Sequence, residues 1–239
     1  MPVFGFIPPP SKDEHQRARI WAASALAALA LIMLMLLIGA PPPPGADLMP
    51  PPLRTAEIAR FERDTGACRR ALAGAGFRTE PLPDRSDGQG CGYHDAVELT
   101  QSLHSYSAPL ATSCAMAAAL ALWERDVVAP AARRRLGQEV TRIELAGPAY
   151  ACRSVAGRRD RRLSEHASAN AVDISGFALA DGSVVSVADG WRGSPRQRAF
   201  LREVRDGACV YFGAVLSPDY NRAHADHLHF DLGRDKLCR

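Results

Sequence analysis

The pattern of apolar and polar positions divides the chain into an N-terminal apolar run and a longer mixed region. Residues 20–40 are 21 positions without a charge, and a helix of this length spans the roughly 30 Å hydrocarbon core of a bilayer. Basic residues precede the run, and the next one along the chain is Arg54. Since basic residues favour the cytoplasmic side, we expect a single-pass inner-membrane anchor, with residues 1–19 in the cytoplasm and the rest in the periplasm. The preceding basic residues are Lys12, Arg17 and Arg19.

A cleaved signal peptide is the alternative interpretation of this run, because it ends in small residues. However, the run is longer than the roughly 7 to 15 apolar residues of a signal peptide. Cleavage after Ala40 would also leave Pro41 at the new N-terminus. We therefore favour an uncleaved anchor at residues 20–40, a stiff proline-rich linker at residues 41–53, and an exported domain at residues 54–239.

The exported region mixes helical and alternating patterns. Apolar residues at helical spacing predict helices over residues 56–75 and 113–127, and Ser194-Pro195 opens a third helix that ends near Arg205. Short apolar or alternating runs predict strands at residues 140–145, 171–177, 184–187, 210–215 and 227–232. These elements together predict an α+β fold with a small antiparallel sheet and flanking helices.

Composition and charge narrow the classes of function. With 47% hydrophobic and 23% charged residues, the chain lies in the ordinary globular range. Its 29 basic and 26 acidic residues give a net charge of only +3. Nucleic-acid binders concentrate basic charge on one face, so we do not expect a nucleic-acid partner.

All six cysteines follow the apolar run, which fits an oxidising compartment. No two of them form a C-x-x-C pair, so a zinc ribbon or a thioredoxin-like motif is disfavoured and three disulfides are expected. The pattern leaves the connectivity open. Proximity along the chain favours sequential pairing, namely Cys68 with Cys91, Cys114 with Cys152, and Cys209 with Cys238.

Two histidine-containing segments of the sequence are candidates for a metal-binding site. On a strand, residues two apart share a face, so His227 and His229 point the same way, and Asp231 follows on that face where it would orient His229. A loop that enters a strand can return His166 and Asp173 to the same point. Two histidines and one carboxylate are the usual protein ligands of a catalytic zinc, which leaves a fourth position for water.

Each cluster alone is weak, because many strand histidines are exposed and bind nothing. Their combination in one exported domain favours a metal site. The remaining histidines have no such neighbours, and we expect them to be ordinary surface or turn residues; they are His15, His94 and His104.

The ordered motifs resemble a known family. The pattern Ser164-x-His166-x6-Asp173 with His224-x-x-His227-x-His229 is similar to the zinc-binding signature of the D-alanyl-D-alanine carboxypeptidase and murein endopeptidase superfamily. The longer pattern resembles the bacterial extensin-like C-terminal domain family over about residues 68–239. Its motifs are Cys114 in a helix, Tyr150-Ala151-Cys152-Arg153, Ser164-Glu165-His166, Phe200-Leu201-Arg202, Ala208-Cys209 and Leu216-Ser217-Pro218.

This resemblance implies a zinc-peptidase-like fold with Zn²⁺ held by His166, Asp173 and His229. It also implies that His227 supports the scissile carbonyl or the water. His224 resembles a further histidine of the endopeptidase branch. The remaining implied residues are Arg153, which would grip a substrate carboxylate or stabilise the oxyanion, and Asp226, at the position of a general-base glutamate.

The function that follows is a membrane-anchored periplasmic zinc metallopeptidase acting on peptidoglycan peptides, by carboxypeptidase or endopeptidase action. Asp226 or His227 would accept the proton of the attacking water. The alternative is a non-catalytic, zinc-containing cell-wall binding module, which the aspartate at position 226 favours. The facial triad of an iron oxygenase ranks lower, because it typically places the carboxylate two positions after the first histidine, whereas Asp173 lies seven positions after His166.

Overall fold

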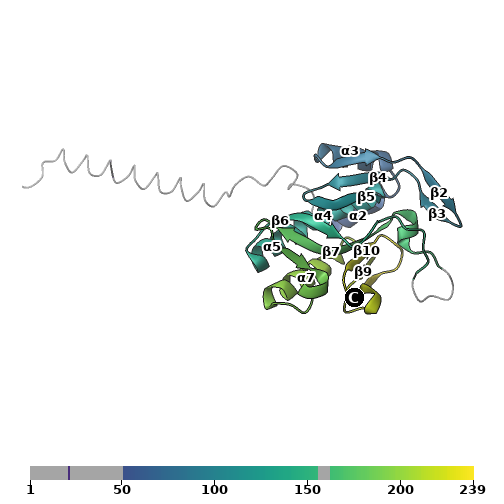
Figure 1. Cartoon of the computed structure of the whole chain (residues 1–239). Coiled ribbons are helices and arrows are strands. Elements are labelled where there is room, and N and C mark those ends of the chain that lie inside the picture. The colour runs from purple at the N-terminus through teal and green to yellow at the C-terminus, as the bar shows by residue number, and fades with distance from the viewer. Residues whose placement is uncertain (1–20, 22–50, 156–161) are drawn as a thin grey trace, which may run out of the picture. The chain divides into compact units, whose positions relative to one another are not determined.

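The computed structural model describes Trp21 and residues 51–155 and 162–239. Residues 48–239 form one compact unit, which contains all the elements discussed below (Figure 1). Except for Trp21, the predicted anchor lies outside the described residues, as does most of the predicted linker. Within the described residues, no helix has the length and apolar character needed to cross a membrane.

A nine-stranded sheet forms the centre of the unit within the described residues. Its order is β1-β4-β5-β6-β7-β10-β9-β11, and β8 pairs with β7 beside this path. The strands are β1 (Arg78–Pro81), β4 (Val97–Gln101), β5 (Ser105–Thr112), β6 (Val140–Leu145), β7 (Ala171–Leu179), β8 (Val184–Ser186), β9 (Ala214–Leu216), β10 (Leu228–Asp231) and β11 (Leu237–Cys238). A separate hairpin pairs β2 (Arg85–Gly88) with β3 (Cys91–Tyr93).

The predicted α+β class is confirmed, but the predicted small antiparallel sheet is wrong in size and in part of its pairing. The pairs β5–β6 and β9–β11 are parallel. A parallel pair needs a crossover connection, and the segment between β5 and β6 is helical. The sequence pattern did not predict β1 to β5. The first four strands have only three to five residues each, and β5 is interrupted by Pro109.

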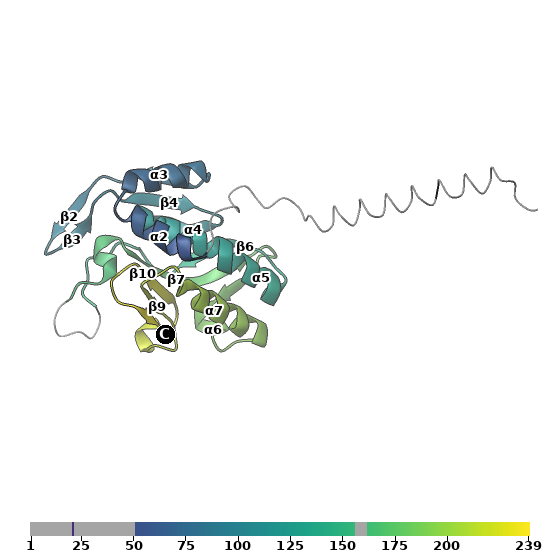
Figure 2. The same cartoon turned by 180° about the vertical axis from the view of Figure 1, so that it is seen from behind.

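The described residues 51–155 and 162–239 contain six α-helices, and Figure 2 shows them from the side opposite to Figure 1. They are α2 (Pro51–Phe61), α3 (Thr65–Gly74), α4 (Cys114–Trp123), α5 (Ala129–Leu136), α6 (Val187–Gly190) and α7 (Pro195–Ala208). A π-helical turn, η1 (Glu124–Val128), joins α4 to α5. Two 3₁₀ turns, η2 (Glu165–Ser168) and η3 (Arg222–His224), precede β7 and β10.

The predicted helix over residues 56–75 is divided into α2 and α3. The break occurs at Asp64, whose carboxylate accepts a hydrogen bond from the backbone N–H of Ala67 at 2.8 Å. Aspartate is a strong N-cap residue because its side chain satisfies a free N–H in the first turn. The N-cap at Asp64 therefore starts a new helix, although the apolar spacing continues through this position.

The third predicted helix is confirmed as α7. It begins with a capping box in which Ser194 and Gln197 satisfy each other's backbone N–H groups, and Pro195 occupies the first turn. The strand predicted at residues 210–215 starts later, at Ala214. Residues 211 and 212 donate instead to the carbonyl of Ala208, which extends the turn after the helix.

The core lies between this sheet and helices α4 and α7. The ring of Phe177 on β7 lies 6.1 Å from Trp123 of α4 and 5.1 Å from Phe200 of α7, centroid to centroid. Because one side chain meets both helices, they cover the same face of the sheet. The ring of Trp123 also lies 5.1 Å from that of Phe230 on β10. The apolar core under α4 therefore extends to β10, the strand that contains His229.

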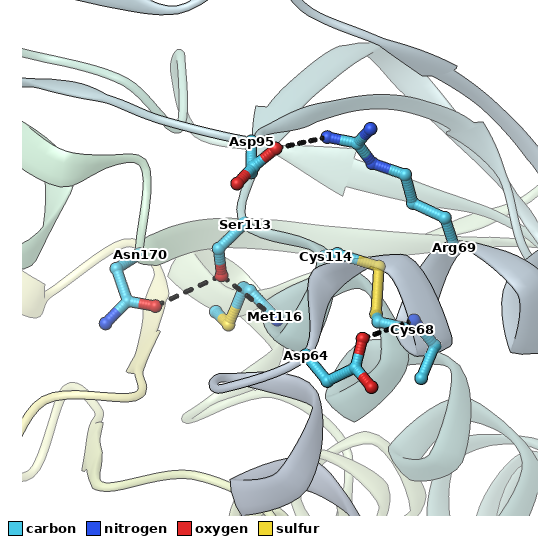
Figure 3. The surroundings of a disulfide bond; sticks show 9 residues. Asp64, Cys68, Arg69, Asp95, Ser113, Cys114, Met116 and Asn170 are labelled. Carbon is cyan, nitrogen blue, oxygen red and sulfur yellow. Dashed lines mark hydrogen bonds and ion pairs between the residues drawn. A yellow bond between two sulfur atoms is a disulfide. The ribbon is translucent and has the colours of Figure 1, made fainter.

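All six cysteines are described and form three disulfides, as expected. The predicted Cys209–Cys238 pair is confirmed. The other two predicted pairs are wrong, because Cys68 of α3 bonds to Cys114 at the start of α4, and Cys91 of β3 bonds to Cys152. Figure 3 shows why the first pair forms, since α3 and the first turn of α4 lie against each other. Proximity in the fold, and not along the chain, decides the pairing.

Candidate metal centre

Strands β7 and β10 form the base of the candidate site. They pair antiparallel with His229 opposite Asp173, and Leu228 opposite Ile174. Leu228 and Ile174 are completely buried. Because side chains alternate along a strand, the face that bears Asp173 and His229 is opposite to the core face. Asp231 shares that second face, as the alternation predicts.

The turn η2 returns His166 to the same place. Ser164 caps the turn, and Ala169 ends it with a left-handed backbone at φ 53°. Few residues other than glycine adopt this conformation. Here the carbonyl of Ala169 accepts bonds from the N–H of Ser113 at 2.8 Å and the hydroxyl of Thr112 at 3.2 Å, which stabilise the reversal.

His166, Asp173 and His229 converge, and their nearest ligand atoms all lie within 4.8 Å of one another. Nε2 of His166 lies 3.2 Å from Oδ2 of Asp173 and 3.3 Å from Nδ1 of His229. Nδ1 of His229 lies 2.8 Å from Oδ1 of Asp173. The two histidines are buried, with His166 fully enclosed. The three residues that the sequence singled out therefore form one group.

The outer nitrogens of both rings have fixed partners. Nδ1 of His166 lies 2.8 Å from the carbonyl oxygen of Ala149, which can only accept, so this nitrogen donates. Nε2 of His229 lies 3.0 Å from Oδ2 of Asp231. With both outer nitrogens donating, each ring in its neutral form has the lone pair of its inner nitrogen beside the carboxylate of Asp173. This donor set of two imidazoles and one carboxylate fits Zn²⁺.

Electrostatics at this group favour the charged carboxylate. Burial by itself would raise the pKa of Asp173, but hydrogen bonds and charge from His166 and His229 hold it well below its usual range. Burial would lower the pKa of His229, yet its bonds to Asp173 and Asp231 raise that pKa to about 9. These pKa values pair a negatively charged Asp173 with a protonated His229 at physiological pH.

His227 and Asp226 lie at the edge of this group. Nε2 of His227 is 3.6 Å from Oδ1 of Asp173, and its Nδ1 is 2.8 Å from Oδ1 of Asp226. The Asp226 side chain is 74% exposed, so it contacts the group only through His227. Of the two residues expected to act as a base, His227 is the one whose nitrogen faces the three ligands.

His224 completes a cluster of imidazoles. Its ring centroid lies 5.2 Å from that of His227 and 5.9 Å from that of His229, and Tyr220 packs against it at 5.6 Å. Burial and the neighbouring His229 lower the pKa of His224 to about 4. The ring is therefore neutral at physiological pH and can offer either a donor or an acceptor to a bound molecule.

Arg153 lies on the exposed side of Asp173, with Nη2 3.4 Å from Oδ2 and half of its side chain accessible. Its backbone carbonyl accepts from the N–H of Ser164 at 3.0 Å, which ties it to the start of η2. The preceding residue, Cys152, is bonded to Cys91 in the β2–β3 hairpin. A guanidinium at the edge of the site is thus held by a covalent link on one side and a backbone bond on the other.

Two of the remaining histidines are described, and one differs from expectation. His94 is exposed beside Asp84, as predicted. His104 is buried, and both its backbone N–H and its Nδ1 contact Oε2 of Glu124, at 3.1 and 3.0 Å. The prediction of a surface or turn residue is correct in that His104 lies in the bend between β4 and β5, but a surface position is wrong. Its burial could not be predicted, because Glu124 lies 20 residues away in sequence and no local pattern links the two. His15 lies outside the described residues.

The sequence could not identify the Ala149 carbonyl as a partner of His166, because a backbone atom leaves no residue signal.

The fold and this group define a mixed α+β domain with a candidate three-ligand metal centre. Residues 66–239 match the family described as extensin-like protein C-terminus. The match spans most of the sequence, and the chain belongs to this family. No curated protein and no solved structure matches the chain.

Proposed function

We propose that the domain is a zinc-dependent peptidase that acts on peptide crosslinks of peptidoglycan. The observation that carries the proposal is the pair of facing ring nitrogens, 3.3 Å apart, whose outer nitrogens both have acceptors. When both rings are neutral, two lone pairs at this distance repel unless a cation lies beside them. Asp173 supplies the negative charge that such a cation needs.

When bound at His166, Asp173 and His229, zinc would supply a water of lowered pKa and polarise the carbonyl under attack. His227 would accept the proton of that water at Nε2, because this atom faces the group. Asp226 would hold the ring by accepting from Nδ1–H at 2.8 Å. In this division of roles, Asp226 acts through His227, which explains how an aspartate serves where the resembling superfamily has a longer glutamate.

The substrate assignment is supported by Arg153 and by the resemblance to carboxypeptidases and endopeptidases of peptidoglycan. A guanidinium recognises a carboxylate by two parallel hydrogen bonds, and the half-exposed Arg153 side chain is available for one. Peptidoglycan peptides offer such a carboxylate beside the scissile bond. His224, whose ring lies 5.2 Å from that of His227, would contact the same peptide.

A periplasmic location with a membrane anchor is part of the proposal. It is supported by the 21 charge-free positions at residues 20–40 and by the three disulfides, which persist in oxidising compartments. Fractionation of cells that produce the full chain tests it. Recovery of the chain in the cytoplasmic fraction would contradict this location.

The peptidase proposal is tested by metal analysis and by digestion of purified peptidoglycan, followed by mass spectrometry of the products. We expect equimolar zinc and new peptide products from the wild-type chain. His166→Ala removes a buried ligand and should abolish both. The matched control His94→Ala changes an exposed histidine that contacts only Asp84 among described side chains, and should change neither. Peptide cleavage by His166→Ala would contradict the proposal.

A second candidate is a non-catalytic zinc module that binds cell-wall peptides. The observation that favours it is the exposed Asp226, which does not contact the three ligands directly. Zinc and peptide binding without any cleavage product would support this second function. Cleavage that is lost in His227→Gln, with zinc retained, would support the peptidase.

A further inference from the structure

Asp231 is a buried carboxylate whose two oxygens have different tasks. Oδ1 accepts two backbone N–H bonds, from Gly233 at 2.8 Å and from Ala214 at 3.2 Å. Oδ2 faces Nε2 of His229 at 3.0 Å. The residue is only 8% exposed, so water cannot easily replace these partners. The fold therefore fixes the hydrogen-bond partners of both carboxylate oxygens.

The two backbone bonds fix the orientation of the carboxyl group. Both donors belong to segments that flank β10, since Ala214 begins β9 and Gly233 follows the end of β10. These segments approach closely, because a Cβ at Gly213 would lie 2.2 Å from the carbonyl oxygen of Gly233. The side chain at position 231 cannot rotate without breaking bonds at this close approach.

We propose that Asp231 is a positioning residue that selects the tautomer of His229, by keeping the ring proton on Nε2 and the lone pair on Nδ1 for the metal. This inference rests on the proposed metal centre. A carboxylate only accepts hydrogen bonds, so Nε2 must donate to it. Nδ1 then faces His166 and Asp173 as a ligand atom. Partners of this kind orient metal-binding histidines and raise their affinity for the metal.

The inference predicts weaker zinc binding by Asp231→Asn than by Asp231→Ala. A purely structural role of Asp231 predicts the reverse order. In Asp231→Asn, the two backbone N–H donors require the amide oxygen at the Oδ1 position, which directs the amide NH₂ at Nε2 of His229. The NH₂ group only donates, so Nε2 must accept and the ring proton moves to Nδ1, where it blocks the metal. Asp231→Ala leaves two backbone donors without an acceptor but does not impose a tautomer.

We therefore expect opposite orders for stability and for zinc affinity. Urea unfolding in the presence of a chelator should rank wild type above Asp231→Asn, and Asp231→Ala lowest, because asparagine keeps the backbone bonds. Zinc affinity, measured by competition with a chromophoric chelator, should fall about 10-fold in Asp231→Ala and about 100-fold in Asp231→Asn. Asp181→Asn, an exposed acid-to-amide change in the turn after β7, is the charge-matched control and should leave zinc affinity unchanged.

The outcomes distinguish the two proposals. If the wild-type chain binds no zinc, the proposed function fails. If the wild type binds zinc and Asp231→Asn binds it at least as tightly as Asp231→Ala, the tautomer inference alone is overturned. Should neither variant fold, nitrogen-15 shifts of the zinc-bound wild-type imidazoles decide. A proton on Nε2 of His229 supports the inference, and a proton on Nδ1 overturns it.

Discussion

Among the described residues, two buried clusters bring a histidine to a carboxylate, and they differ in how completely their polar atoms are paired. In the closed cluster, Glu124 is fully buried and accepts from Ser102 at 2.6 Å, from His104 at 3.0 and 3.1 Å, and from the hydroxyl of Tyr106. In the open cluster around Asp173, three ligand atoms converge on one point and a half-exposed arginine borders it.

The comparison shows that a buried carboxylate can either stabilise a fold or remain able to bind a ligand. A carboxylate whose oxygens already accept from several donors has no capacity left for a ligand, so the closed cluster joins the start of β5 to η1. Asp173 instead faces two ring nitrogens that compete for one proton. Burial alone does not identify a functional group, whereas the balance of donors and acceptors does.

The largest expected effect is the loss of Glu124. Glu124→Ala removes the acceptor of the His104 N–H groups and leaves the hydroxyls of Ser102 and Tyr106 with only each other, 3.3 Å apart. Each buried donor left without an acceptor costs about 1 to 3 kcal/mol. We expect the free energy of unfolding in urea to fall by about 3 to 5 kcal/mol. Glu124→Gln keeps one acceptor oxygen and should lose less. Zinc affinity of the folded fraction should stay unchanged, and a fall in that affinity would show that the clusters are coupled.

The disulfides should give similar stability but unequal effects on the site. Residue separations of 61 for Cys91–Cys152 and 46 for Cys68–Cys114 predict losses of about 4 kcal/mol each in the loop-entropy account. Replacing either pair by serine should therefore lower unfolding free energy almost equally. Only the Cys91–Cys152 pair adjoins Arg153, so its removal should weaken peptide binding in calorimetry. Equal weakening by both double variants would contradict this assignment.

The closed cluster should also produce a pH dependence of stability in the alkaline range. Burial and the nearby charge of Glu124 raise the pKa of Tyr106 well above 10.0. Above about pH 10 the unfolded chain releases a proton that the folded chain retains, so stability falls as pH rises, by up to about 1.4 kcal/mol per pH unit. Below that pH the tyrosine contributes no slope.

Tyr106→Phe removes this proton and tests the assignment. Unfolding free energies from about pH 8 to pH 11 should fall less steeply in the variant than in the wild type. The two chains share every other tyrosine, so the difference between the two curves isolates Tyr106. Parallel curves would show that Tyr106 is not the source of the slope.

The smallest expected change in stability is at the edge of the open cluster. Arg153 is half exposed and 3.4 Å from Asp173, and exposed ion pairs contribute about 0 to 1 kcal/mol. Arg153→Ala should change the unfolding free energy by no more than this amount, while peptide binding is lost. Arg142→Ala, which breaks the similarly exposed pair with Glu144, is the matched control and should leave peptide binding intact. Normal peptide binding by Arg153→Ala would contradict the proposed role.

The sequence predicted the two site strands and the face that His229 shares with Asp231, because both follow from local alternation. β7 and β10 lie where the pattern indicated, and His229 and Asp173 occupy the same face. The pattern could not predict which strands pair, since β10 enters the sheet between β7 and β9. Pairing over long separations depends on the whole core, and no short period records it.

The wrong predictions have the same physical origin. Cys68 and Cys91 are neighbours among the cysteines along the chain, but α3 packs on α4, and β3 packs near η2, so each finds another partner. His104 has no acidic neighbour in sequence, yet the fold brings Glu124 to it. Contacts made by tertiary structure, and backbone acceptors such as the Ala149 carbonyl, leave no signal in residue spacing.

The place of β10 in the sheet has a consequence for the order of folding. Helix α4 and its neighbours form from local contacts, whereas His229 meets Asp173 only after a loop of 56 residues has closed. Closing long loops slows the formation of such contacts. The centre should therefore assemble late, after the helices. In pulsed hydrogen exchange during refolding, amides of α4 should gain protection before those of β10, and simultaneous protection would contradict this sequence of events.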